Sequence, residues 1–174
     1  MSNREPIETT NLDTMYGSQP IPWSRPHELL AVGAFAGPGT SFFLGTVRPD
    51  GRPHAAGIGA AWYDGDLYFQ CGPNTRKARN VAANPACTLS GTLPGMDLVF
   101  EGDARRVTDA PTLEALAAIY REGGWPVEVE GDAFRAPFSA PSAGPPPWHL
   151  FRMTVHTVFG IASDEPYGAT RWRF

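Results

Sequence analysis

The sequence has little lysine, little cysteine and no long apolar run. Lysine occurs once, at Lys77, beside 13 arginines, and cysteine occurs only at Cys71 and Cys87. Neither cysteine belongs to a C-x-x-C pair, so we expect reduced thiols in the core and neither a disulfide framework nor a zinc cluster. No apolar run approaches the roughly 20 residues that cross a bilayer, and the first eight residues lack the apolar centre of a signal peptide. These absences predict a cytoplasmic protein with no membrane partner.

An excess of positive charge is also missing. Lys plus Arg total 14 against 18 Asp plus Glu, which gives a formal net charge of -4 at pH 7. A nucleic-acid-binding surface is usually basic, so we expect no nucleic acid partner. The 174 residues, 42% of them hydrophobic, suffice for one globular domain.

The histidines lack the spacing of a metal site. No H-x-x-x-H or H-E-x-x-H pattern occurs among the four of them, and no G-x-S-x-G elbow marks a nucleophilic serine. We therefore predict no metal site and assign no catalytic side chain. A single axial histidine would be enough for a haem, and that option stays open.

Apolar runs and turn residues predict a mainly β domain over residues 23–174, preceded by an extended or partly disordered arm over residues 1–22. Pro-Asp-Gly at 49–51 and the Asp-Gly-Asp segment at 64–66 separate three strands of a meander. The predicted strands are 41–48, 53–62, 67–69, 86–91, 96–107, 148–161 and 169–174. The predicted helices are 24–32, which precedes a Gly-rich segment at 37–39, and 75–83 and 109–122. Antiparallel strands with helical inserts indicate a β barrel decorated with α helices.

Prolines dominate one late segment. Residues 133–147 contain five prolines and are predicted to have no regular structure. Two interpretations of residues 137–147 remain open: a lid over a site, or an ordinary surface loop.

Residues 71–80 join a predicted strand to the beginning of a helix. The backbone N–H groups of a helix N-terminus favour an anion, and Thr75, Arg76 and Lys77 add a hydroxyl, a guanidinium and an ammonium group. This combination predicts a phosphate site. The alternative is that the basic residues form a solvated helix face, although this chain otherwise uses arginine for its positive charge.

Four segments, in this order and spacing, resemble the pyridoxamine 5'-phosphate oxidase-like family of FMN-binding split barrels. They are FFLGTVRPDGRPH at 42–54, WYDGDLYF at 62–69, TRKARN to NP at 75–85, and ATRWRF at 169–174. The resemblance covers about residue 23 to the C-terminus. It implies a six-stranded antiparallel split barrel that forms a homodimer, with flavin cofactors at the subunit interface.

The resemblance also implies which residues contact the cofactor. Arg76 and Lys77 match the pair that grips the flavin phosphate, with Thr75 beside them. Pro53, His54, Ala55 and Ala56 fall on the strand that faces the isoalloxazine ring, where small side chains permit close approach. Gln70 and Cys71 end the strand along the ribityl chain.

The C-terminal Arg171-Trp172-Arg173-Phe174 alternates cations and aromatic residues. On a strand this pattern places the two aromatics on one face and the two arginines on the other. We expect the aromatics to pack into the barrel or the dimer seam and one arginine to lie near the cofactor, which adds Trp172 and Arg173 to the candidate site. The alternative is aromatic packing with both arginines in solvent.

The resemblance implies an oxidoreductase that binds FMN and transfers hydride to or from a small organic substrate. The true oxidases end in a longer segment that binds pyridoxal phosphate, and this chain has no such segment, so vitamin B6 oxidation is not expected. Two alternatives remain: a reductase that uses the 8-hydroxy-5-deazaflavin coenzyme, and a non-catalytic flavin or haem carrier or sensor.

Overall fold

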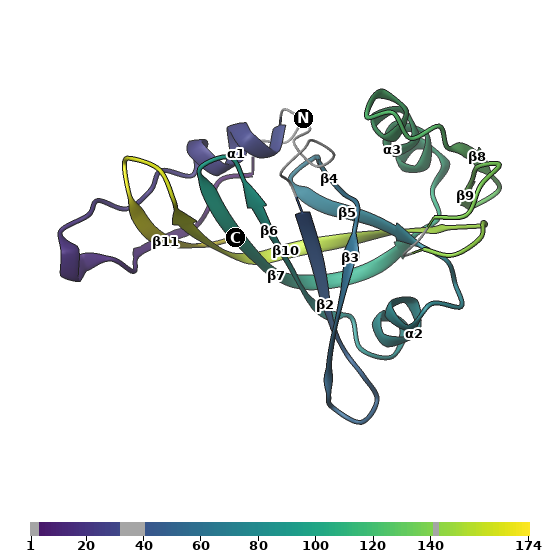
Figure 1. Ribbon diagram of the computed structural model, residues 1–174, viewed down its shortest axis with the longest axis horizontal. Helices are drawn as coiled ribbons and strands as arrows, with labels where there is room; N and C mark the ends of the chain where they lie inside the picture. The colour runs from purple at the N-terminus through teal and green to yellow at the C-terminus, as the bar shows by residue number, and fades with distance from the viewer. Residues whose placement is uncertain (1–3, 32–40, 141–142) are drawn as a thin grey trace.

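The computed structural model describes residues 4–31, 41–140 and 143–174 and has a mainly β architecture (Figure 1). Within these ranges, nine strands form an antiparallel sheet that does not close. The nine strands are β1 (Glu8–Asn11), β2 (Ser41–Val47), β3 (Pro53–Ile58), β4 (Ala60–Tyr63), β5 (Asp66–Cys71), β6 (Ala86–Leu93), β7 (Met96–Val107), β10 (His149–Ala162) and β11 (Gly168–Arg173). A separate hairpin consists of β8 (Glu128–Glu130) and β9 (Ala133–Arg135). The predicted split barrel is confirmed, with additional strands at its margins.

Two of the helices begin at residues whose side chains cap them. The helices are the short 3-10 helix η1 (Thr14–Tyr16) and the α helices α1 (Ser24–Ala31), α2 (Arg76–Ala83) and α3 (Ala110–Glu122). The carboxylate of Asp109 accepts the N–H of Thr112 at the start of α3, and Thr75 caps α2 in the same way. Val32, the predicted end of the first helix, and the Gly-rich segment 37–39 lie outside the described residues. No helix in the described ranges has the length and apolarity of a membrane span.

Strand β10 connects the parts of the sheet. It pairs with β7 along nearly its whole length, while its other edge pairs first with β5 and then with β11. From β7 the sheet continues through β6 and β2 to β3, which is its last strand. Figure 1 shows the consequence: α2 lies beside the β2–β3 hairpin, and β11 lies in a different part of the molecule.

Two groups of buried side chains stabilise this arrangement. The larger fills the barrel and includes Leu44, Phe69, Leu89, Phe100 and Trp172, all 0% exposed. The smaller lies beneath α3 and contains Trp148 together with the apolar face of that helix: Leu113, Leu116, Ala117 and Tyr120.

Two predicted segments differ from the structure. The strand predicted over 53–62 is broken at Gly59 into β3 and β4, which pair with β2 and β5 respectively, so the predicted three-strand meander is wrong. A glycine there allows the chain to leave one strand and enter another. Residues 133–147 contain β9 and an isolated bridge between Ala140 and Gly144, so this segment is not wholly irregular. Pro141 lies outside the described residues.

The N-terminal arm contains a strand that the sequence did not predict. Strand β1 pairs with β11 from Glu8 opposite Arg173 to Asn11 opposite Thr170. The carboxylate of Glu8 also accepts hydrogen bonds from Arg171 and Arg173, each at 3.0 Å. The arm is therefore joined to the C-terminal strand by backbone pairing and by charge.

Candidate functional site

The beginning of α2 is held by Thr75. Its hydroxyl donates to the carbonyl of Gly72 at 2.8 Å and accepts the N–H of Ala78 at 3.4 Å. A serine or threonine at this position satisfies one of the free N–H groups of the first turn. The predicted helix N-terminus is therefore present, with Arg76 and Lys77 as its first two residues.

The buried face of α2 is polar at two positions. Lys77 is 4% exposed and Asn80 is 2% exposed, whereas Ala82 is exposed. The Asn80 side chain donates to the Thr46 hydroxyl at 2.9 Å, and this hydroxyl donates to the carbonyl oxygen of His54 at 3.4 Å. These two bonds connect α2 through β2 to β3.

Three cations surround His54. Burial lowers the pKa of His54, and the positive charges of Arg48, Arg76 and Lys77 lower it further. Burial also lowers the pKa of Lys77. We call Arg48, His54, Arg76 and Lys77 the cationic cluster.

Two atoms of the cationic cluster are buried without a hydrogen-bond partner among the described residues: Nε of Arg48 and Nδ1 of His54. Arg76 is exposed and makes no hydrogen bond or ion pair with the described residues. Buried polar atoms usually have partners, and unsatisfied ones cost free energy. An anion with several oxygen atoms would satisfy these donors and neutralise the cations.

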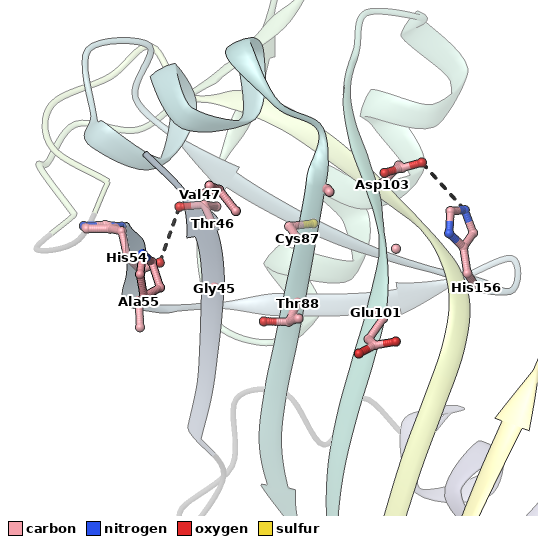
Figure 2. A pocket seen from close by; sticks show the side chains of 13 residues that line it. Gly45, Thr46, Val47, His54, Ala55, Cys87, Thr88, Glu101, Asp103 and His156 are labelled. Carbon is pink, nitrogen blue, oxygen red and sulfur yellow. Dashed lines mark hydrogen bonds and ion pairs between the residues drawn. The ribbon is translucent and has the colours of Figure 1, made fainter. Parts of the chain in front are cut away.

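A pocket of about 510 Å³ lies across the sheet face beside this cluster (Figure 2). At one side it is lined by Pro53, His54 and Ala55 of β3, and at the other by Glu101, Asp103 and His156. Figure 2 shows these two groups separated by β2 and β6. We call this the sheet-face pocket, and it contains three of the predicted site residues.

Strand β3 offers backbone groups as well as small side chains. Among the described strands it pairs only with β2, in a register that sets Ala55 opposite Gly45 and Ala56 opposite Leu44. Its other edge therefore has N–H and C=O groups without a sheet partner. Such an edge can bind a flat heteroaromatic ring that has donors and acceptors on its rim.

Cysteine chemistry is not favoured at this site. Cys71 is fully buried at the end of β5, and burial raises the pKa of its thiol. Cys87 lines the sheet-face pocket, and burial raises its pKa to about 12. Both thiols are protonated near neutral pH and are poor nucleophiles. Gln70, beside Cys71, is buried, and its Oε1 has no partner.

Trp172 and Arg173 are not brought to the cationic cluster within one chain. Trp172 is fully buried in the barrel core, in edge contact with the ring of Trp23 at 5.4 Å between centroids. Arg173 pairs with Glu8 of the N-terminal arm. Figure 1 shows β11 well separated from α2, so a role at the same cofactor would have to come from a second copy of the chain.

The Pro-rich segment packs against the loop that precedes α2. Gly72 donates its N–H to the carbonyl of Ala143 at 3.0 Å, and Ala143 is 3% exposed. A side chain at Gly72 would collide with this carbonyl. This packing supports the loop before α2 from outside, and the lid interpretation stays untested.

The sequence interpretation missed Arg48, Thr46 and Asn80. Arg48 was included in a family-like segment but was not assigned to the site. Its position directly before a Pro-Asp-Gly turn was the available signal, because a hairpin returns the next strand beside it. Asn80 gave no signal, since a polar residue in a short helix is usually solvated.

The comparisons with known proteins agree with this geometry. The family model described as "Pyridoxamine 5'-phosphate oxidase" matches residues 33–162, and no curated protein matches the chain significantly. A pyridoxamine 5'-phosphate oxidase-related, FMN binding protein from Nostoc punctiforme is 18% identical, with a TM-score of 0.57 over 87% of this chain and 90% of that one. General Stress Protein 26 from Bacillus anthracis is 17% identical, with a TM-score of 0.54 over 86% of this chain and 99% of that one.

A heme binding protein from Mycobacterium smegmatis also has a similar fold, with 13% identity and a TM-score of 0.56 over 81% of this chain and 56% of that one. At these identities the solved structures establish the fold. The family model covers well over half of the sequence. The chain belongs to the pyridoxamine 5'-phosphate oxidase-like split-barrel family.

Proposed function

We propose that this protein is an oxidoreductase that binds FMN and transfers hydride to or from a small organic substrate. The cationic cluster is the observation that carries the proposal. It combines a helix N-terminus, three cations and two buried donor or acceptor atoms without partners. A phosphate monoester has the charge and the oxygen atoms that such a cluster requires.

The described residues fit the cofactor in three parts. Thr75, Arg76 and Lys77 would hold the phosphate, with Arg48 beside them. Gln70 would face the ribityl chain with its unpartnered Oε1. Pro53, His54, Ala55 and Ala56 would lie against the ring, because β3 combines small side chains with a free backbone edge.

The bound flavin would supply the hydride chemistry, and this chain would bind, orient and shield it. Because the pKa of His54 is lowered, its imidazole stays neutral near pH 7 and can accept or donate one hydrogen bond. Both cysteine thiols remain protonated. No side chain is assigned as a catalytic acid, base or nucleophile.

We propose further that two copies form the cofactor site. A cross-strand row made of the exposed Phe43 and Val99 and the half-buried Phe159 crosses β2, β7 and β10, with Ser90 of β6 between the first two. Phe43 is 51% exposed and Val99 is 37% exposed. An apolar row of this length on an open sheet face is typical of a surface that a partner covers. In such a dimer, Arg173 is a candidate to contact the partner's cofactor, whereas Trp172, fully buried in its own barrel, can act there only by holding β11 in place.

Two alternatives use the same fold. The 8-hydroxy-5-deazaflavin coenzyme also has a phosphate-bearing tail, so the cationic cluster is compatible with it. A haem carrier is favoured by one observation: His156 is exposed and lines the sheet-face pocket, where it is available as an axial ligand.

The visible absorption spectrum of the purified protein, loaded with each cofactor in turn, distinguishes these options. We expect FMN to remain bound during gel filtration, so that the protein fraction shows the absorption spectrum of a flavin. We also expect the reduced, bound flavin to be reoxidised when an unsaturated or carbonyl acceptor is added. A deazaflavin or haem spectrum supports the corresponding alternative. A bound flavin that no acceptor reoxidises supports a carrier.

A further inference from the structure

A second pocket, of about 610 Å³, lies between α2 and strands β7 and β10. It shares no lining residue with the cationic cluster or the sheet-face pocket. The side of α2 that carries Asn80 faces β2, and Arg79 and Ala82 line this second pocket. We call it the α2–β7 pocket.

The charge of this pocket is opposite to that of the whole chain. Arg79, Arg105, Arg106 and His149 line it, and no Asp or Glu among the described residues does. The chain as a whole has a net charge of -4. Three guanidinium groups around one pocket therefore form a strongly positive region in an acidic protein.

The three arginines differ in their hydrogen bonds, ion pairs and orientation. Arg106 forms an ion pair with Asp132 at 2.7 Å, and Arg79 donates to the carbonyl of Asn74 at 3.0 Å. Arg105 lies opposite Arg152 of β10, so its side chain points to the sheet face away from Arg106, Phe151 and α2. The planar forks of Arg79 and Arg106 are on the pocket side, and each has further N–H groups that can donate to a carboxylate or phosphate.

The floor of the pocket is apolar. Val81 and Phe151 are buried at 5% and 6% exposure, and both line the pocket. His149 is half-buried, and burial, followed by the charge of Arg106, lowers its pKa. Near neutral pH its imidazole is therefore uncharged and can form one further hydrogen bond.

We propose that the α2–β7 pocket binds an amphipathic organic anion, with its carboxylate or phosphate on Arg79 and Arg106 and its apolar body on Val81 and Phe151. The volume lies in the range of small-molecule sites. The proposal does not depend on the flavin, because the pocket and the cationic cluster use different residues.

Calorimetric titration of the full chain in phosphate-free buffer tests this site. The probes are phenyl phosphate, benzoate and inorganic phosphate. We expect phenyl phosphate or benzoate to bind more tightly than inorganic phosphate, because only the aromatic probes have an apolar body. Comparison of the two aromatic probes identifies the preferred acidic group. Equal binding of phenyl phosphate and inorganic phosphate, or no binding of either aromatic probe, overturns the proposal.

Two variants locate the bound probe. Arg79→Ala removes a guanidinium on the pocket side of α2 and should weaken binding of the aromatic probe about 10-fold or more. Ala82→Phe fills the pocket from an exposed helix position while leaving every cation in place, and it should also abolish binding. Arg52→Ala, which removes an exposed arginine outside the pocket, is the matched control and should bind as the wild type does. Circular dichroism checks that each variant is folded.

A competition experiment between FMN and the aromatic probe distinguishes this site from the proposed flavin site. Saturation with FMN should leave the affinity for the aromatic probe unchanged, and Arg76→Ala should weaken FMN binding alone. Displacement of the probe by FMN, or unchanged probe binding in Arg79→Ala and Ala82→Phe, would show that the probe occupies another site. Failure of FMN to bind leaves the probe titration valid, so the two proposals fail independently.

Discussion

At the scale of single residues, the cationic cluster depends on two neighbours in α2 with different surroundings. Arg76 is exposed, whereas Lys77 is almost fully buried. If each contributes a charge-assisted contact of about 1.5 to 3 kcal/mol, then Arg76→Ala and Lys77→Met should each weaken FMN binding roughly 10- to 100-fold. Arg79→Ala, on the same helix, should leave FMN affinity unchanged. Fluorescence titration measures all three, and wild-type affinity in both cluster variants would remove these residues from the site.

His54 gives a prediction about pH. Its pKa is below the ordinary value of about 6.5 in the folded chain and returns to that value on unfolding. As the pH falls below about 6.5, the unfolded state binds a proton that the folded state does not, so the free energy of unfolding decreases. His54→Asn should therefore lose less stability than the wild type between pH 7.5 and pH 5.5. Urea unfolding at both pH values tests this, and equal losses would contradict it.

At the scale of elements, β11 supports the barrel core. Trp172 is fully buried, and Gly160 on the facing strand leaves space for its ring. Trp172→Ala should reduce the free energy of unfolding by about 3 to 5 kcal/mol, as expected for a large buried aromatic residue. Trp172→Phe should lose less because it retains most of the packing. Chemical denaturation measures both, and a loss below about 1 kcal/mol for the alanine variant would contradict the observed packing.

Two arginine variants test whether the C-terminal strand contributes to cofactor binding. If Arg173 contacts the partner's cofactor, Arg173→Ala should weaken FMN binding while changing stability little, because its ion pair with Glu8 is solvent-exposed. Arg171→Ala is the matched control, since this residue also binds Glu8. Unchanged FMN affinity in both variants would make this segment purely structural.

Most elements could be predicted from local signals, and the exceptions have physical reasons. Strand β7 alternates buried residues with more exposed ones from Met96 to Arg105, and α3 has both a capping aspartate and a regular apolar face, so both were predicted correctly. Strand β1 has the sequence Glu-Thr-Thr-Asn and buries little of it, because its partner is the edge of β11. No periodicity reveals such a strand. The break at Gly59 was missed because β3 and β4 together look like one long apolar run.

The site was partly predictable for a related reason. Thr75, Arg76 and Lys77 are contiguous, so their spacing alone indicates a phosphate site at a helix N-terminus. Arg48 and Thr46 reach the same place through the β2–β3 hairpin and the burial of Asn80. Contacts of this kind depend on how helix and sheet pack, which local sequence does not specify.

At the scale of the whole molecule, the cross-strand row predicts a dimer. Interfaces of stable homodimers bury about 2,000 Å² or more, and the open sheet face offers Phe43, Val99 and Phe159 for this purpose. Light scattering at micromolar concentration should give about twice the 18.8 kDa chain mass. Val99→Asp should shift the particle toward the monomer and weaken FMN binding, whereas Thr108→Asp should do neither. A stable wild-type monomer with FMN bound would contradict the two-subunit site.

The central claim is that the cationic cluster binds the phosphate of a flavin, and riboflavin provides the direct comparison because it lacks only that phosphate. Calorimetric titration of the wild-type protein with FMN and with riboflavin measures the contribution of the phosphate in one experiment. The account predicts that FMN binds at least about 10-fold more tightly, with the difference decreasing as salt is added. Equal affinities, or an affinity for FMN that salt does not change, would contradict it.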